Sequence, residues 1–242
     1  MADDSSIALP PRDYADVVKL QDKTVLDEFL DDPSTEALAI ITGAFAGGGK
    51  GLMVSAGRIA QGLLKGQVYD VFADELRRLR DAGKIPDNLG ETKHGLYTWA
   101  ELMRIIDDEC PDAERLEALK AMFFDVNKIN ATDKEQMYAY QLWQITKKLS
   151  SGEVLVMKTI HADRNHLSRL QYGGWLMRIA EVSGLVSDEM VELHLSKLRE
   201  YKIVYPGKSD RPSNGGISRL GISLCDNIQT YRTIIDQMKK QS

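Results

Sequence analysis

Apolar residues recur at spacings of three and four along residues 13–149, and nothing here alternates apolar and polar positions over a useful length. Leu116, Leu119 and Phe123 are one example of such a helical face. Asp112 precedes that face, where a carboxylate can accept hydrogen bonds from the first backbone N–H groups of a helix. A Ser/Thr-x-x-Glu capping box occurs at Thr98 and Glu101, at Thr132 and Glu135, and at Ser150 and Glu153. We therefore predict an all-helical domain over residues 13–149, after a flexible arm at 1–12.

The order of elements changes in residues 150–242. A helix at 151–161 is followed by the runs WLMRIAEVSGL and SDEMVELHLSKLRE, which predict two helices joined by a tight turn at Gly184. Glycine suits such a turn because it adopts positive φ without steric cost. Ser187 is placed to cap the second of these helices. The buried face of that helix is predicted to carry Val191, Leu195 and Leu198.

The segment after these helices predicts a small hairpin. Ile203 and Val204 begin a strand, the polar loop at 206–216 would be a wing, and a returning strand is expected in ISRLGISLCDNI. A final helix is predicted at 220–238. The fold class expected from these patterns is mainly α. It consists of the N-terminal helical domain and a C-terminal winged helix-turn-helix domain, residues 150–242, with a β-hairpin wing.

Residues 150–225 resemble winged helix-turn-helix regulators of the bacterial type. The pattern of that family is Val-x-x-x-Leu-x-x-Leu, a short strand, a wing and Leu-Thr-x-x-Gly, although the Thr is absent here. The matching residues are Val191, Leu195, Leu198, Ile203, Val204, Arg219, Leu220 and Gly221. The whole chain also resembles uncharacterised helical bacterial proteins linked to abortive infection of phage, in runs such as KGQVYDVFADELRRLRDAGKIPDN and PDAERLEALKAMFF.

The resemblance implies two alternative functions for the second helix. In the regulator family its exposed early residues enter the major groove of double-stranded DNA, while the rest of the chain serves dimerisation or sensing. Winged helices also act as protein-interaction scaffolds, here in phage defence, and an acidic helix favours this alternative because carboxylates repel phosphates. The DNA-binding candidates are Ser187, Lys197, Lys208, Arg211 and Arg219, and the partner-binding candidates are Asp188, Glu189 and Glu192.

The distribution of charge leaves both alternatives open. Residues 150–242 contain 13 Lys and Arg against 10 Asp and Glu, and the preceding residues contain 18 against 26. A mildly basic C-terminal half is compatible with nucleic acid but lacks the dense basic patch of many DNA-binding proteins. We expect a homo-oligomer.

The beginning of the chain, MADDSSIALPPRDY, lacks the basic and then apolar order of a signal peptide. We therefore expect a cytoplasmic protein, with Cys110 and Cys225 as buried, reduced thiols.

The glycine-rich segment 43–66 has 8 glycines among its 24 residues. Close packing of helices is favoured over a membrane-active amphipathic segment, since Lys50, Arg58 and Lys65 are its only cations. The run at 47–51 does not have the spacing of a phosphate-binding loop. We find no catalytic constellation and no metal-ligand spacing, and we expect neither an enzyme nor a cofactor.

Overall fold

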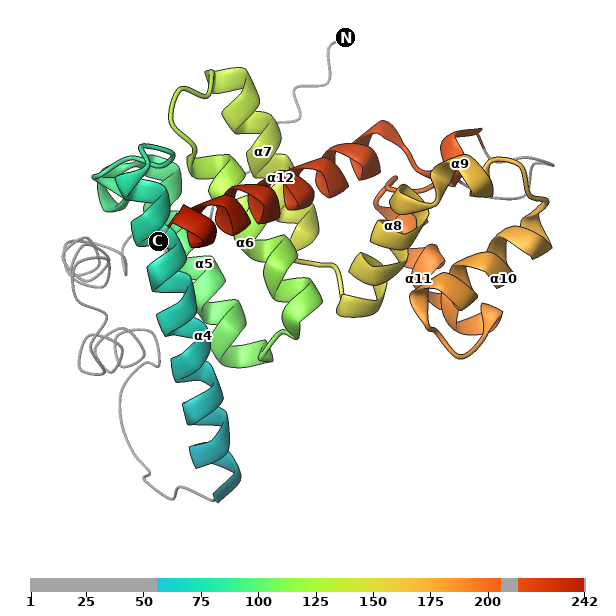
Figure 1. Ribbon diagram of the computed structural model, residues 1–242, viewed down its shortest axis with the longest axis horizontal. Coiled ribbons are helices and arrows are strands. Elements are labelled where there is room, and N and C mark those ends of the chain that lie inside the picture. The colour runs from blue at the N-terminus through green and yellow to red at the C-terminus, as the bar shows by residue number, and fades with distance from the viewer. Residues whose placement is uncertain (1–55, 206–212, 242) are drawn as a thin grey trace, which may run out of the picture. The chain divides into compact units, whose positions relative to one another are not determined.

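A computed structural model describes residues 56–205 and 213–241 of the chain (Figure 1). The predictions for the N-terminal arm, for most of the glycine-rich segment and for Lys208 and Arg211 lie outside these residues. The described residues form the α-helices α4 (Ala56–Asp81), α5 (Lys93–Glu109), α6 (Ala113–Asn127), α7 (Asp133–Thr146), α8 (Ser151–Ala162), α9 (Arg164–Leu167), α10 (Tyr172–Ser183), α11 (Asp188–Glu200) and α12 (Arg219–Gln241). Two short 3-10 helices, η1 (Leu89–Glu91) and η2 (Ser213–Gly216), complete the set.

The chain divides into two compact units, and the division falls within α4 and α5. Of the described residues, the first unit contains 56–77 and Asp87–Tyr97, and the second contains Arg78–Pro86, 98–205 and 213–241. In the first unit, Tyr69, Phe72 and Ala73 of α4 are buried.

Thr92 caps the start of α5. Its Oγ1 accepts a hydrogen bond from the backbone N–H of Gly95 at 2.9 Å and donates one to the carbonyl oxygen of Leu89 at 2.9 Å. The prediction that Thr98 and Glu101 form a capping box is therefore wrong, because both lie inside α5. The Thr98 hydroxyl instead accepts a hydrogen bond from Asn127, and the Glu101 carboxylate accepts from Trp143 and Lys147.

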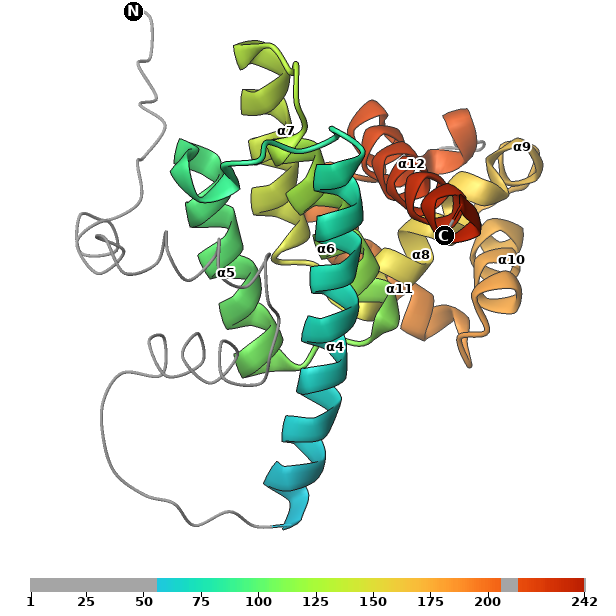
Figure 2. The same ribbon diagram turned by 60° about the vertical axis from the view of Figure 1, so that its left-hand side comes forward.

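In the second unit α12 packs against α6 and α8, and α6 also packs against α7 (Figures 1 and 2). The apolar stripe of α12 makes this packing possible, with Leu224, Ile228 and Tyr231 buried along one side. The rings of Tyr231 and Phe124 meet with their centroids 5.8 Å apart. Burial of such faces is the main favourable contribution to folding here.

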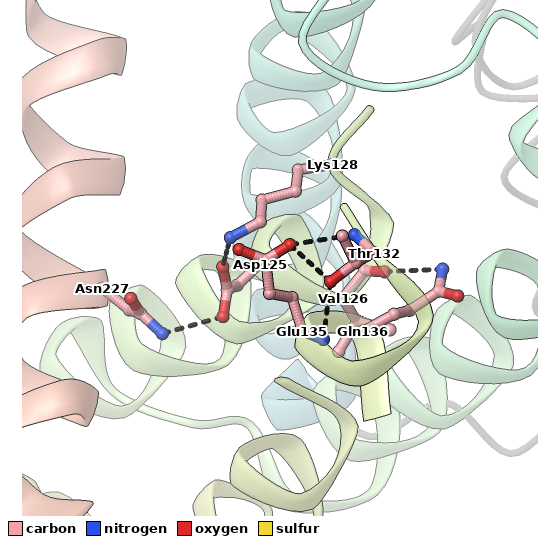
Figure 3. A network of polar contacts seen from close by, with 7 residues as sticks. All are labelled: Asp125, Val126, Lys128, Thr132, Glu135, Gln136 and Asn227. Carbon is pink, nitrogen blue, oxygen red and sulfur yellow. Dashed lines mark hydrogen bonds and ion pairs between the residues drawn. The ribbon is translucent and has the colours of Figure 1, made fainter. Parts of the chain in front are cut away.

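A polar network holds α12 beside the end of α6 (Figure 3). The buried carboxylate of Asp125 accepts hydrogen bonds from the Asn227 amide of α12 at 2.8 Å and from the Lys128 ammonium at 2.7 Å. Next to it, Thr132 and Glu135 form the predicted capping box of α7. The capping box of Ser150 and Glu153 at α8 and the capping residue Asp112 at α6 are confirmed as well.

Helices α8, α10 and α11 pack on one another as a three-helix cluster, drawn in yellow and orange in Figure 1. The predicted stripe of α11 is confirmed, since Val191, Leu195 and Leu198 have no exposed surface. Trp175 and Ile179 of α10 are buried as well. The remaining apolar residues of this core include Val154, Met157, Ile160, Ile203 and Ile217.

The predicted β-hairpin wing is wrong for the described residues. They contain one isolated antiparallel bridge, between Val204 and Ile217, and no β-strand. The bridge cannot extend because the chain forms η2 on one side of Ile217 and begins α12 two residues after it. Tertiary contacts fix this geometry: the Trp175 indole N–H donates to the Gly215 carbonyl at 2.8 Å. The run ISRLGISLCDNI is thus largely helical, in agreement with the predicted final helix.

The two cysteines differ in their surroundings. Cys225 is buried and free, as predicted, and burial raises the pKa of its thiol to about 12. Cys110 is free but exposed, so its predicted burial is wrong. It follows α5, which ends at Glu109, and adopts a φ of 44°.

Candidate functional site

The joint between α10 and α11 is built by two local signals that the sequence predicts. Gly184 ends α10 with a φ of 72°, a conformation that costs glycine little. Ser187 then caps α11, because its Oγ accepts a hydrogen bond from the backbone N–H of Met190 at 3.4 Å. The two helices are therefore joined by a short turn between Gly184 and Ser187.

A polar cluster from both helices fixes this arrangement. The Tyr172 hydroxyl of α10 donates a hydrogen bond of 2.5 Å to Glu192 of α11, and the Arg199 guanidinium donates to both side chains. Burial and the hydrogen bond with Glu192 raise the pKa of Tyr172. Burial lowers the pKa of Arg199, but its bonds with Glu192 and Tyr172 outweigh that effect and raise it. Glu192, a predicted partner-binding residue, is therefore engaged between α10 and α11.

The side of α11 that faces away from the core exposes apolar side chains. Leu193 is 60% exposed and Met190 is 42% exposed, and a spacing of three places them on one helix face. Val186, just before the cap, is 98% exposed. A residue at this position often packs on the fourth residue of the helix, here Val191, but Val191 is buried while Val186 stands in solvent. Val186, Met190 and Leu193 form the apolar face of this region.

The apolar face is accompanied by acidic residues. Asp188 and Glu189, two predicted partner-binding residues, are exposed in the first turn of α11. The pKa of Glu189 is lowered by a hydrogen bond with the Ser187 side chain, by one with the backbone N–H of Glu189 itself and by one with the Asp188 side chain. The Glu189 carboxylate therefore stays ionised at neutral pH. The predicted DNA contact Lys197 is also exposed and bonds to the Glu200 carboxylate at 3.1 Å, which raises the pKa of Lys197.

The other predicted DNA-binding residues within the described part of the chain lie on different elements. Arg219 is exposed at the first position of α12, whereas Ser187 is committed to capping α11. Ser187 thus lies at the start of α11, Asp188 and Glu189 in its first turn, and Lys197 in its last turn. The sequence analysis did not predict the apolar face. A signal for it was present, because Met190 and Leu193 lie outside the stripe of Val191, Leu195 and Leu198. All five apolar residues together are spread too widely around the helix to be buried on one face.

A second group of titratable side chains lies where α8 meets α12. The imidazole Nε2 of His161 is 3.1 Å from an Asp226 carboxylate oxygen and 3.0 Å from an Arg164 guanidinium nitrogen. Burial lowers the pKa of His161, Arg164 lowers it further, and Asp226 acts in the opposite direction.

No cluster of three or more His, Cys, Asp or Glu side chains suited to a metal ion occurs in the residues that the structure describes. None of the helices within that part of the chain combines the length and the apolar character required to cross a membrane. Comparisons of the chain with family models, with curated proteins and with solved structures found no match.

Proposed function

We propose that this protein is an interaction module that binds a protein partner through the apolar face, formed by Val186, Met190 and Leu193. The observation that carries the proposal is the exposure of Leu193 and Met190 on α11, at a spacing that joins them on one face. Exposed apolar side chains that group together and are rimmed by polar residues are typical of protein-protein contacts. Leucine and methionine anchors on a helix are a common form of such contacts.

The charges on α11 support this function over nucleic-acid binding. Asp188 and Glu189 are exposed at the end of α11 that would approach DNA first, and Lys197 is engaged with Glu200. Affinity for DNA depends on Lys and Arg side chains that displace counterions from phosphates. Carboxylates at the leading end of the helix oppose that interaction, whereas they do not oppose a protein partner.

Site-specific photo-crosslinking in the cells that produce the protein tests the proposal. A photoreactive amino acid at Leu193 is expected to give a covalent adduct of discrete mass that protease destroys and nuclease does not. The same label at Gln237, exposed on α12, is the matched control. Adding Met190→Ser to the Leu193-labelled protein should remove the adduct. An adduct equal to that of the control, or one that disappears with nuclease, would reject the proposal.

DNA binding is the second candidate function, and the helix-turn-helix order of α10 and α11 favours it. Lys197 and Arg219, together with Lys208 and Arg211 outside the described residues, would supply the phosphate contacts. Fluorescence anisotropy of the full chain with duplex DNA across a salt series is the test. Binding that weakens with salt, with a smaller slope after Lys208→Ala and Arg211→Ala, would support this function.

A further inference from the structure

We infer that the partner of the apolar face is an amphipathic helix with lysine or arginine beside its apolar stripe. This inference rests on the proposed function, because it concerns the same surface. It specifies the chemistry of the partner, which the exposure of Leu193 and Met190 alone does not.

The exposed charges of α11 are mostly acidic. The exposed charged residues of α11 are Asp188, Glu189, Lys197 and Glu200, so three carboxylates accompany one ammonium group. Glu192 adds no free charge, since Arg199 neutralises it within the polar cluster. Lys197 is compensated in turn by Glu200. The uncompensated charges are thus those of Asp188 and Glu189, at the same end of α11 as Val186 and Met190.

Hydrogen bonds at both ends of α11 hold it in a fixed position beside α10. The Ser187 cap and the Tyr172, Glu192 and Arg199 cluster hold α11 in place on α10. A surface that is already ordered loses little conformational entropy when it binds, which favours docking of a preformed or folding helix. The spacing of Met190 and Leu193 matches the spacing of apolar residues on a facing helix, so both stripes can interlock.

A second copy of this chain fits the surface less well. Two copies that met through their apolar faces would bring two surfaces with the same excess of carboxylates together. Charges of the same sign that face each other across an interface oppose association. A basic helix instead places its cations next to Asp188 and Glu189.

Three fluorescent helical peptides of equal length test the inference against the full-length protein. They share a leucine stripe with a spacing of three and four, and their flanking positions carry lysine, glutamine or glutamate. Fluorescence anisotropy at physiological salt is expected to give the tightest binding for the lysine peptide. Its affinity should exceed that of the glutamate peptide by only about tenfold, because each exposed ion pair contributes little. Asp188→Asn with Glu189→Gln should abolish this preference. Leu193→Ser should weaken the binding of all three peptides by about tenfold or more, because apolar anchors contribute most of the affinity in such contacts.

Asp236→Asn, which removes an exposed carboxylate of α12, is the matched control and should leave the preference unchanged. Circular dichroism of each variant checks that the fold is kept. The inference is overturned if no peptide binds, if the order of affinities is the same after Asp188→Asn and Glu189→Gln, or if sedimentation shows a dimer that Leu193→Ser dissociates. If the peptide experiment overturns the inference, the proposed function still holds provided that photo-crosslinking at Leu193 gives the protein adduct and that this adduct requires Met190. Absence of that adduct removes both.

Discussion

The Tyr172 hydroxyl and the Glu192 carboxylate, 20 residues apart in the chain, join α10 to α11 by a hydrogen bond of 2.5 Å. Arg199 completes the arrangement by donating to the same carboxylate at 2.5 Å. A residue that the sequence offers as a surface acid is therefore part of the joint between the two helices. Substitution of Glu192 would change the presentation of the apolar face and would not test partner binding alone.

Tyr172→Phe should lower the free energy of unfolding by about 1–3 kcal/mol, because it removes both the hydrogen bond that the hydroxyl donates to Glu192 and the one that it accepts from Arg199. The phenyl ring keeps the stacking of Tyr172 on Trp175, whose ring centroids lie 5.7 Å apart, so the effect isolates the hydroxyl. Urea denaturation followed by circular dichroism measures it. Tyr205→Phe, at an exposed tyrosine, is the matched control. Equal stability of the Tyr172→Phe variant and the wild type would show that the hydroxyl does not support the joint.

Gly221→Ala should destabilise the protein by about 1–3 kcal/mol, as overpacking of a tight contact does. A methyl group at Gly221, in the first turn of α12, would lie 2.6 Å from the backbone carbonyl oxygen of Ile203. Gly173→Ala is the opposite case, because a methyl group there meets nothing within 4 Å. In a helix this change should stabilise by up to about 1 kcal/mol. Thermal unfolding of both variants tests the pair, and a stable Gly221→Ala protein would contradict the close approach.

His161 should make the protein less stable as the pH falls. Burial and Arg164 lower its pKa in the folded chain below the usual 6.5, so the unfolded chain binds a proton at higher pH. The contribution of neutral His161 to the free energy of unfolding is complete above pH 6.5. It is lost as the pH falls from 6.5 through the pKa of His161 in the folded chain. The change in free energy of unfolding between pH 8 and about pH 5.5 should be smaller in His161→Gln than in the wild type. The same replacement at the exposed His166 is the matched control. A pH dependence that His161→Gln leaves unaltered would contradict the prediction.

Asn227→Asp should weaken the attachment of α12 to α6. The new carboxylate would lie where the Asn227 amide donates to Asp125 at 2.8 Å, and two carboxylates at that distance repel each other. Lys128 offsets part of the repulsion. The destabilisation should therefore be present at pH 7 and shrink in acid, as one of the two carboxyl groups takes up a proton. Asn227→Ala removes the hydrogen bond without the charge, and a similar pH profile for the two variants would argue against the repulsion.

The sequence by itself determined those features that depend on neighbours within about four residues. The capping boxes at α7 and α8, the turn at Gly184 and the cap at Ser187 are of this kind. Each involves a side chain and a backbone group of the same turn, so the local order of residues suffices to specify it. The buried stripe of α11 was predictable for the same reason, because helical periodicity fixes which residues share a face.

Tertiary structure decided the features for which a local pattern competes with a distant partner. Thr98 and Glu101 have the spacing of a capping box, but they bond to distant residues instead. Thr98 accepts a hydrogen bond from Asn127, and Glu101 accepts from Trp143 and Lys147. The hairpin expected around Ile217 gives way to one β-bridge and a helix, because Trp175 binds the Gly215 carbonyl.

The candidate site was decided in the same way. Asp188 and Glu189 are exposed at the first turn of α11, as a helix start permits, but the engagement of Glu192 depends on Tyr172 of another helix. The exposure of Met190 and Leu193 likewise depends on how α11 rests on α8 and α10. Periodicity tells which residues share a helix face, and packing between elements decides which face is covered.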